Sequence, residues 1–270
     1  MTSRSCSLTK PLPSERVAQR DRTAMTRISI LMYHQVGEFA RPREHRSTYC
    51  HVRRFRAQMR YLQRMRIPVL ALPEAFAILC EGRPFQGHGV VLTFDDGDRS
   101  FAEFAHPVLA SCGFPSSVFV VSALIGQPAG WFAADGRETP AIMDAETIRA
   151  LHRQSVIFGP HTLSHPRLSR VSTDQIVQEV EQSKAQLEAL LGETMDFFCY
   201  PYGDYDERVI AAVKRAGFRG ALSCIRGSAV PGEEDPFQLP RKAISYGDTL
   251  FGFWWKLHVK HRKKRAPLGY

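Results

Sequence analysis

The stretch VVLTFDDGDRSF, residues 90–101, places two carboxylates side by side directly after an apolar run. The run has the β-branched and aromatic composition of a buried strand, and Gly97 follows the two acids. Asp95 and Asp96 are therefore predicted to lie where a strand ends. In folds built from parallel strands, that edge of the sheet carries the chemistry.

Strand-like and helical segments alternate along the chain on both sides of this stretch. Strands are predicted at 28–34, 88–94, 116–122, 155–161, 196–203 and 219–224. Helices are predicted at 55–65, 100–113, 144–154, 172–192 and 206–218. Asp144 and Gly192 are predicted to cap two of them. This alternation predicts parallel strands joined by crossover helices, and therefore an α/β domain.

The composition is that of an ordinary globular protein, with 44% hydrophobic and 23% charged residues. No apolar run approaches the roughly 20 residues of a membrane-spanning helix. Residues 1–26 are polar and basic and lack the apolar core of a signal peptide, so we expect a disordered tail and a cytoplasmic protein. The six cysteines form no CxxC pair and are expected to be reduced thiols.

Much of the net charge of +9 lies near the C-terminus, where six Lys and Arg residues fall within 256–265, after Trp254 and Trp255. We expect residues 250–270 to form a Trp-rich basic tail beyond a catalytic domain at 27–249. Such a tail suits peripheral docking on the anionic inner face of a membrane, and a solvated tail on a core helix is an equal alternative. Nucleic-acid binding is not expected, because the basic residues accompany no recognisable motif.

Other predicted strands also end in polar residues of catalytic type. These residues are His34, His161 with His165, and Tyr200 with Tyr202. Two histidines four residues apart can share a metal ion on one helical turn, and the flanking Pro160 and Pro166 favour a single turn within a loop. Combined with a strand-end carboxylate, the histidines predict a catalytic divalent metal site with open positions.

TFDDG (93–97), HTLSH (161–165) and YPYG (200–203), in this order, resemble the motifs of the polysaccharide deacetylase family. This family is also called the NodB-homology or carbohydrate esterase 4 family. LMYHQV (31–36) and LPRKAIS (239–245) are similar to its poly-N-acetylglucosamine deacetylase branch. The resemblance covers roughly residues 28–245. It implies a single-domain, distorted (β/α) barrel that removes N- or O-acetyl groups from sugars with a metal ion.

The resemblance also implies roles for the motif residues. Asp95 is the general base, and the metal, expected to be Zn²⁺, is held by Asp96, His161 and His165. Backbone N–H groups near Tyr200 and Tyr202 contribute to an oxyanion hole. The chemistry agrees independently, because Zn²⁺ brings a bound water to a pKa of about 7 and an ordinary Asp is ionised at that pH.

The sequence departs from the family pattern at two catalytic positions. Cys199 stands where the family often has the arginine that orients the base, and we predict that Arg241 takes that role. The L-x-H segment that supplies the acid has no clear counterpart near the C-terminus. We predict His34 as the acid, and a structural hydrogen-bonding histidine is the alternative.

The predicted function is metal-dependent removal of acetyl groups from an N-acetylated glycan or a lipid-linked saccharide. One alternative is a deformylase or small-molecule amidohydrolase of the same fold, with its pocket closed by the loop at 126–143. Another is a catalytically silent carbohydrate-binding domain. Asp95 argues against that last alternative, because binding a sugar or a metal needs no base beside the metal ligand.

Overall fold

The computed structural model describes residues 26–40, 42, 44–135 and 139–264. The tail expected at 1–26 lies outside the described residues except for Thr26, as does the end of the chain from residue 265. Among the described residues, no helix combines the length and the apolar character that crossing a bilayer demands.

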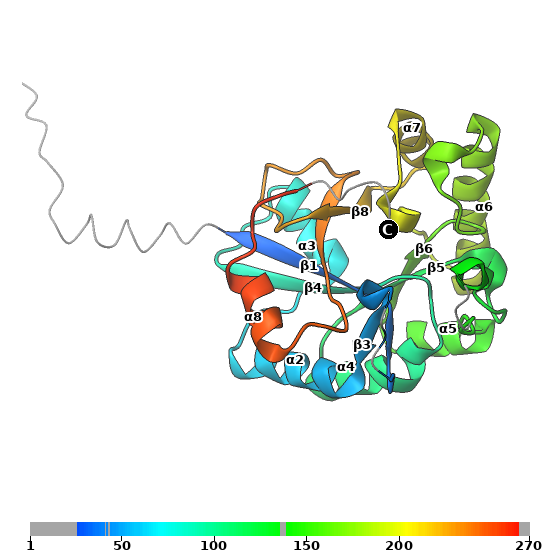
Figure 1. Cartoon of the computed structure of the whole chain (residues 1–270). Coiled ribbons are helices and arrows are strands. Elements are labelled where there is room, and N and C mark those ends of the chain that lie inside the picture. The colour runs from blue at the N-terminus through cyan, green and yellow to red at the C-terminus, as the bar shows by residue number, and fades with distance from the viewer. Residues whose placement is uncertain (1–25, 41, 43, 136–138, 265–270) are drawn as a thin grey trace, which may run out of the picture.

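Seven parallel strands form one curved sheet that is nearly closed into a barrel (Figure 1). In sheet order they are β6 (Ile157–Pro160), β5 (Ser117–Val120), β4 (His88–Phe94), β1 (Arg27–Tyr33), β9 (Leu239–Ala243), β8 (Gly220–Arg226) and β7 (Phe197–Cys199). The edge strands β6 and β7 approach closely, since a Cβ on Gly159 would lie 2.6 Å from the Phe197 carbonyl oxygen. The predicted α/β class and distorted (β/α) barrel are confirmed.

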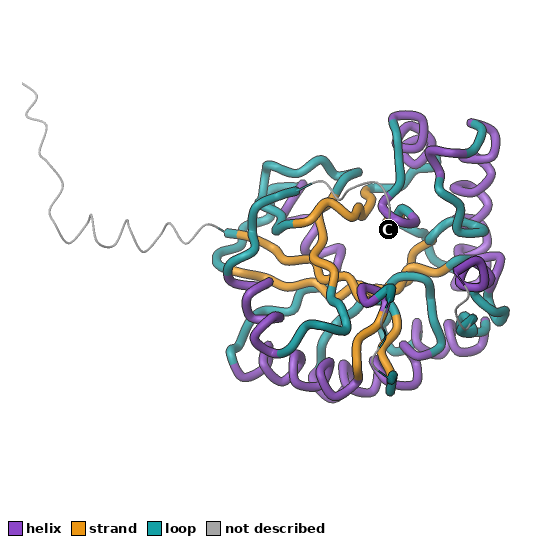
Figure 2. The backbone as a smooth tube through the Cα atoms, in the orientation of Figure 1, coloured by secondary structure: helices purple, strands orange, loops and turns teal. Residues whose placement is uncertain are grey.

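Helices surround the sheet on the outside (Figure 2). They are α2 (Val52–Arg64), α3 (Leu72–Cys80), α4 (His106–Cys112), α5 (Ala145–His152), α6 (Thr173–Leu191), α7 (Glu207–Arg215) and α8 (Leu250–His258). A π-helical segment, Phe101–Ala105, precedes α4. A separate pair of short parallel strands, β2 (Gln35–Gly37) and β3 (Tyr49–His51), lies beside the barrel.

Local sequence signals account for several helix ends. The Asp144 carboxylate accepts a hydrogen bond from the Thr147 backbone N–H and caps α5 as predicted. Ser172 and Gln175 form a capping box at the start of α6. Gly192 ends α6 in the left-handed conformation, at φ 70°, which glycine adopts without strain.

The first nine residues of the expected C-terminal tail form α8. Phe253 and Leu257 are buried, and the Tyr61 ring of α2 packs edge-on against Phe253 with ring centroids 6.1 Å apart. A hydrogen bond of 2.8 Å joins the Tyr61 hydroxyl to His258 Nε2. This helix therefore belongs to the folded domain.

Three histidines gather between the start of β4 and the end of α8. The His88 ring lies 5.9 Å from that of His258 and 6.1 Å from that of His261. Burial, with help from Arg27 and Lys242, lowers the pKa of His88 to about 3. Burial also lowers the pKa values of His258 and His261. The fold therefore favours the neutral rings.

This histidine cluster is expected to make the protein less stable in mild acid. Below pH 6.5 these histidines bind protons in the unfolded chain, whereas in the folded cluster they stay neutral. The free energy of unfolding therefore falls as the pH decreases. The contribution of His88 alone to the free energy of unfolding falls by about 1.4 kcal/mol for each pH unit between about pH 6 and pH 4. Urea unfolding at pH 7 and pH 5 should show a smaller pH effect for His88→Gln than for the natural protein. Equal pH effects would contradict this account.

Candidate active site

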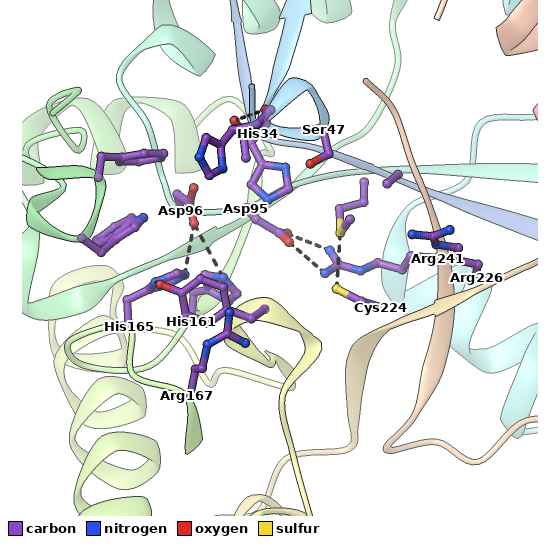
Figure 3. A pocket seen from close by; sticks show the side chains of 17 residues that line it. His34, Ser47, Asp95, Asp96, His161, His165, Arg167, Cys224, Arg226 and Arg241 are labelled. Carbon is purple, nitrogen blue, oxygen red and sulfur yellow. Dashed lines mark hydrogen bonds and ion pairs between the residues drawn. The ribbon is translucent and has the colours of Figure 1, made fainter. Parts of the chain in front are cut away.

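A cavity of about 400 Å³ opens at the carboxyl ends of the strands. It brings together seven of the eight residues that the sequence predicted for the site: His34, Asp95, Asp96, His161, His165, Tyr202 and Arg241 (Figure 3). Met32, Trp131 and Phe132 add apolar and aromatic walls. The cavity thus has charged groups in its floor and apolar surface around them.

Tyr200 is the predicted residue that does not reach the cavity. Its side chain is fully buried in the core, where its hydroxyl donates to the Phe237 carbonyl at 3.0 Å. Its backbone N–H donates to the Leu222 carbonyl at 3.2 Å. Both donors are therefore engaged within the fold, and a contribution of Tyr200 to an oxyanion hole stays a prediction.

The two adjacent acids reach one cavity because the chain leaves the pleat between them. The Asp95 N–H still donates to the Tyr33 carbonyl, which continues the parallel ladder from β1. Asp96 and Gly97 then take left-handed conformations, with φ 71° and 79°. A non-glycine residue held in this region is strained, and such strain is concentrated at functional sites. Strand alternation therefore does not separate the two carboxylates.

Asp96, His161 and His165 form a buried group that could hold a metal ion. The Nε2 atoms of His161 and His165 lie 3.7 and 3.4 Å from Asp96 Oδ1. His161 Nδ1 lies 2.8 Å from the Cys199 carbonyl oxygen. Because a carbonyl only accepts, this Nδ1 carries the proton, and Nε2 presents its lone pair to the cavity.

Electrostatics favours the metal-binding protonation states of His161 and Asp96. Burial lowers the pKa of His161 to about 4, so its ring is neutral near pH 7. Burial acts to raise the pKa of Asp96, but the hydrogen bond with His165 and the surrounding histidines outweigh it and hold the pKa below its usual range. A carboxylate and neutral imidazole nitrogens are suitable ligands for a divalent ion.

The HTLSH segment adopts no helical turn, contrary to the sequence prediction. The His161 N–H bonds to the Val120 carbonyl and extends β6 by one residue. Thr162 and His165 each have φ 67°, so the chain reverses twice in the left-handed region. The Thr162 hydroxyl accepts from the His165 N–H at 2.9 Å. The two rings therefore converge through an irregular loop.

Asp95, His161 and Cys199 form a second buried group with metal-ligand spacing. Burial raises the pKa of the Cys199 thiol well above its ordinary value, so the thiolate that binds metals is disfavoured. Arg241 also lies 3.2 Å from the Cys199 sulfur and occupies both oxygens of Asp95. The group with Asp96 is consequently the better metal site.

Arg241 forms a two-pronged ion pair with Asp95. Its two terminal nitrogens donate to the carboxylate oxygens at 2.7 and 2.8 Å, and its Nε donates to the Ser223 carbonyl at 2.9 Å. Burial acts to raise the pKa of Asp95, but the charge and hydrogen bonds of Arg241 lower it overall. Arg241 thus contacts the base as predicted for the arginine that the family often has at the position of Cys199. The Cys199 sulfur itself lies against the Arg241 guanidinium.

His34 lies at the end of β1 and points into the cavity near both acids (Figure 3). Its Nδ1 is buried and has no hydrogen-bond partner in the structure. A histidine with a purely structural role would be expected to form a hydrogen bond through this buried atom, so the missing partner does not support that alternative. Its catalytic role stays a prediction.

Residues 82–221, just over half of the chain, match the family model described as polysaccharide deacetylase. The chain belongs to the polysaccharide deacetylase family. It is thus a hydrolase of the type that removes N-acetyl groups by cleaving an amide C–N bond.

Individual relatives of this deacetylase are distant in sequence but similar in fold. YxkH of Bacillus subtilis is 23% identical over 82% of this chain and 72% of its own length. A Staphylococcus aureus poly-β-1,6-N-acetyl-D-glucosamine N-deacetylase is 22% identical over 76% of this chain and 72% of its own length.

Two solved structures, both with TM-scores of 0.73, are a Streptococcus pyogenes deacetylase, PplD, in complex with acetate and IcaB from Ammonifex degensii. The first is 20% identical and covers 87% of this chain and 99% of its own. The second is 22% identical and covers 86% and 97%. These likenesses show that the deacetylase shares their fold.

Trp131 and Glu179 also contribute to the site, and of the two only Trp131 stands out in the sequence, as a ring suited to stack on a sugar or to anchor its loop. The Trp131 ring stacks on His165, with centroids 4.2 Å apart and planes at 23°. Glu179 of α6 accepts hydrogen bonds from the backbone N–H groups of Leu163 and Ser164 at 2.8 and 2.9 Å, and from the Ser164 hydroxyl. No local signal marks Glu179, because it is one of several acids on a long amphipathic helix.

Glu179→Ala is expected to weaken metal binding by about 10- to 100-fold, because the loop between His161 and His165 loses its anchor. Glu181→Ala is the matched control, since Glu181 lies on the same helix and pairs only loosely with Arg215, at 3.7 Å. Competition with a fluorescent chelator measures both affinities. Equal affinities for the two variants would show that the loop needs no such anchor.

Proposed function

We propose that this deacetylase removes the acetyl group from an N-acetylated sugar with a divalent metal ion and the Asp95 carboxylate. Zn²⁺ is the proposed metal. The proposal rests on one observation, which is that a group suited to bind a metal ion and a carboxylate suited to act as a base lie in the same cavity. Asp96, His161 and His165 form a metal-ligand group, and Asp95 is held beside it by Arg241.

One carboxylate and two imidazoles are a ligand set that suits zinc and leaves coordination positions open. A bound ion of this kind would supply an activated water and polarise the acetyl carbonyl. The fit rests on His161, whose Nδ1 is committed to the Cys199 carbonyl and whose Nε2 therefore faces Asp96. His165 Nδ1 lies 3.1 Å from the Tyr202 hydroxyl, which can either donate or accept the hydrogen bond.

Asp95 is suited to accept the proton of the attacking water. Arg241 keeps it ionised and fixes its orientation, so each carboxylate oxygen retains a lone pair directed away from the guanidinium. The backbone N–H of Tyr202 would then help to stabilise the developing oxyanion, because the N–H groups of Gly203 and Asp204 already donate to the Tyr200 and Pro201 carbonyls. Tyr202 takes a left-handed conformation, φ 59°, in the turn after β7, which turns its ring toward His165.

His34 is proposed to return a proton to the leaving amine. Its position beside the two acids, with a buried Nδ1 available, supports this role. A His34→Asn enzyme should lose the alkaline limb of the pH–rate profile, because that limb reports loss of the protonated acid. A profile with the same two limbs as the natural enzyme would exclude His34 as the acid.

The cavity and the relatives support a proposal for the substrate class. A volume of about 400 Å³ is appropriate for a sugar unit carrying its acetamido group, and Met32, Trp131 and Phe132 offer apolar surface to the methyl and the ring. One relative is named for deacetylating poly-β-1,6-N-acetyl-D-glucosamine. We therefore propose an N-acetylated hexosamine in a glycan or a glycolipid.

Acetate release from β-1,6- and β-1,4-linked N-acetylglucosamine oligomers and from lipid-linked N-acetyl sugars tests this proposal. N-formyl and small N-acetyl amides serve as competing substrates for the amidohydrolase alternative. We expect release from at least one glycan or glycolipid, with kcat/KM above that for the small amides. A preference for the small amides would overturn the proposed substrate class, and sugar binding without acetate release would favour a silent binding domain.

A further inference from the structure

Large apolar side chains are exposed almost entirely at one place on the described part of the chain. Five of the six that are exposed lie on α8 or directly after it: Leu250, Phe251, Trp254, Trp255 and Val259. Phe251 is 69% exposed, and Trp254 and Trp255 are 38% and 41% exposed. We call these five residues the α8 face. Contiguous exposed apolar surface of this kind marks an interaction site.

The α8 face is held rigidly on the outside of the barrel (Figure 1). Buried Phe253 and Leu257 anchor the opposite side of the helix, and the Thr249 hydroxyl caps its first turn. The Phe251 ring stacks near Trp254, with centroids 5.8 Å apart and planes at 22°. The aromatic rings therefore stay presented to solvent while the helix packs on the core.

Exposed cations continue the chain directly after the α8 face. Lys260, Arg262, Lys263 and Lys264 are all exposed. Asp248 pairs with Lys256 and Glu234 pairs with Lys263, so the positive charge that these carboxylates leave uncompensated is that of Lys260, Arg262 and Lys264. Lys260 lies at the aromatic surface, since its N–H donates to the Trp255 carbonyl at 3.1 Å, and the cations that follow it run back toward β8 through the bridge between Lys264 and Arg226.

We propose that the α8 face docks on an anionic lipid surface. Tryptophan rings favour the boundary between headgroups and acyl chains, and adjacent Lys and Arg side chains attract anionic headgroups. Protein–protein interfaces are depleted in lysine, whereas lysine close to exposed tryptophan is typical of membrane surfaces. The composition of the α8 face and the adjacent Lys260 therefore favours a lipid surface over a protein.

The α8 face is connected to the rim of the catalytic cavity through the loop that precedes the helix. The Tyr246 N–H donates to the Arg46 carbonyl at 2.8 Å, and the neighbouring Ser47 and Thr48 line the cavity. None of the five residues of the α8 face lines the cavity itself. Docking is consequently independent of the proposed chemistry and can be tested without a known substrate.

Flotation of the full chain with liposomes tests the proposal. One set of vesicles is phosphatidylcholine alone, and the other contains phosphatidylglycerol as well. We expect flotation with the anionic vesicles only, with a loss on raising the salt concentration. Phe251→Ser with Trp255→Ser, and separately Lys260→Glu with Arg262→Glu, should each reduce the bound fraction by at least tenfold. Met65→Ser is the matched control, because Met65 is 58% exposed and lies outside the α8 face.

Far-UV circular dichroism and the melting temperature establish that each variant is folded. Flotation of the natural protein with neutral and anionic vesicles alike, or with neither, would overturn the proposal. Unchanged flotation of either double variant would also overturn it. A change in oligomeric state on removing the aromatic side chains, without any vesicle binding by the natural protein, would assign the surface to a protein contact instead.

Discussion

Asp95→Asn is expected to lower kcat by about 10²- to 10⁴-fold, the range typical of a general base. The amide keeps a similar shape but accepts no proton at neutral pH. Metal affinity should change little, because the proposed ligands are Asp96, His161 and His165. Glu103→Gln, which alters an exposed carboxylate paired with Arg99, is the matched control.

The two measurements for Asp95→Asn separate catalysis from metal binding. Acetate release is compared at a temperature at which both variants are folded, and metal affinity is measured by chelator competition. A variant that keeps its activity would exclude Asp95 as the base. A variant that loses metal in parallel with activity would instead place Asp95 among the ligands.

Arg241→Met is expected to destabilise the fold by about 3–5 kcal/mol, because it leaves the buried Asp95 without its counter-charge. The Asp95→Asn, Arg241→Met double variant should be less destabilised than Arg241→Met, since neither buried charge remains. Because Arg241 lowers the pKa of Asp95, the loss should be present at neutral pH and should diminish only in acid.

Urea unfolding of the four proteins in this cycle measures the coupling between Asp95 and Arg241. If the changes in the free energy of unfolding of the two single variants add up to that of the double variant, the two residues are not coupled. That result would contradict the ion pair seen in the structure. Activity of Arg241→Met should also fall, because the base loses its orientation. Full activity in a folded Arg241→Met enzyme would contradict the orienting role.

The strand ends were predictable because the acids and histidines directly follow apolar runs. The motifs TFDDG and HTLSH indicated the metal group, and the missing family arginine at Cys199 directed attention to Arg241. The convergence of the carboxylates could not be derived from alternation along a strand. It depends on the left-handed conformations of Asp96 and Gly97, which the sequence only suggests through the glycine.

Other features depended on tertiary contacts that the sequence does not display. Strand β9 was not predicted because its five residues include Pro240, Arg241 and Lys242, which a pattern analysis assigns to a loop. Tyr200 follows a strand in the same motif as Tyr202, but its side chain turns into the core. The sequence left the C-terminal segment open between a membrane-docking tail and a solvated tail on a core helix, and the helix was identified only by the burial of Phe253 and Leu257.

Metal dependence of acetate release tests the central claim most directly. The enzyme is first stripped with a chelator and then titrated with Zn²⁺, while bound metal and acetate release are measured on the same samples. We predict no activity in the stripped enzyme and recovery that saturates at one ion per chain. Asp96→Asn should fail to recover, because it removes the only carboxylate of the ligand group. Full acetate release from a stripped enzyme, with no metal bound, would contradict the account.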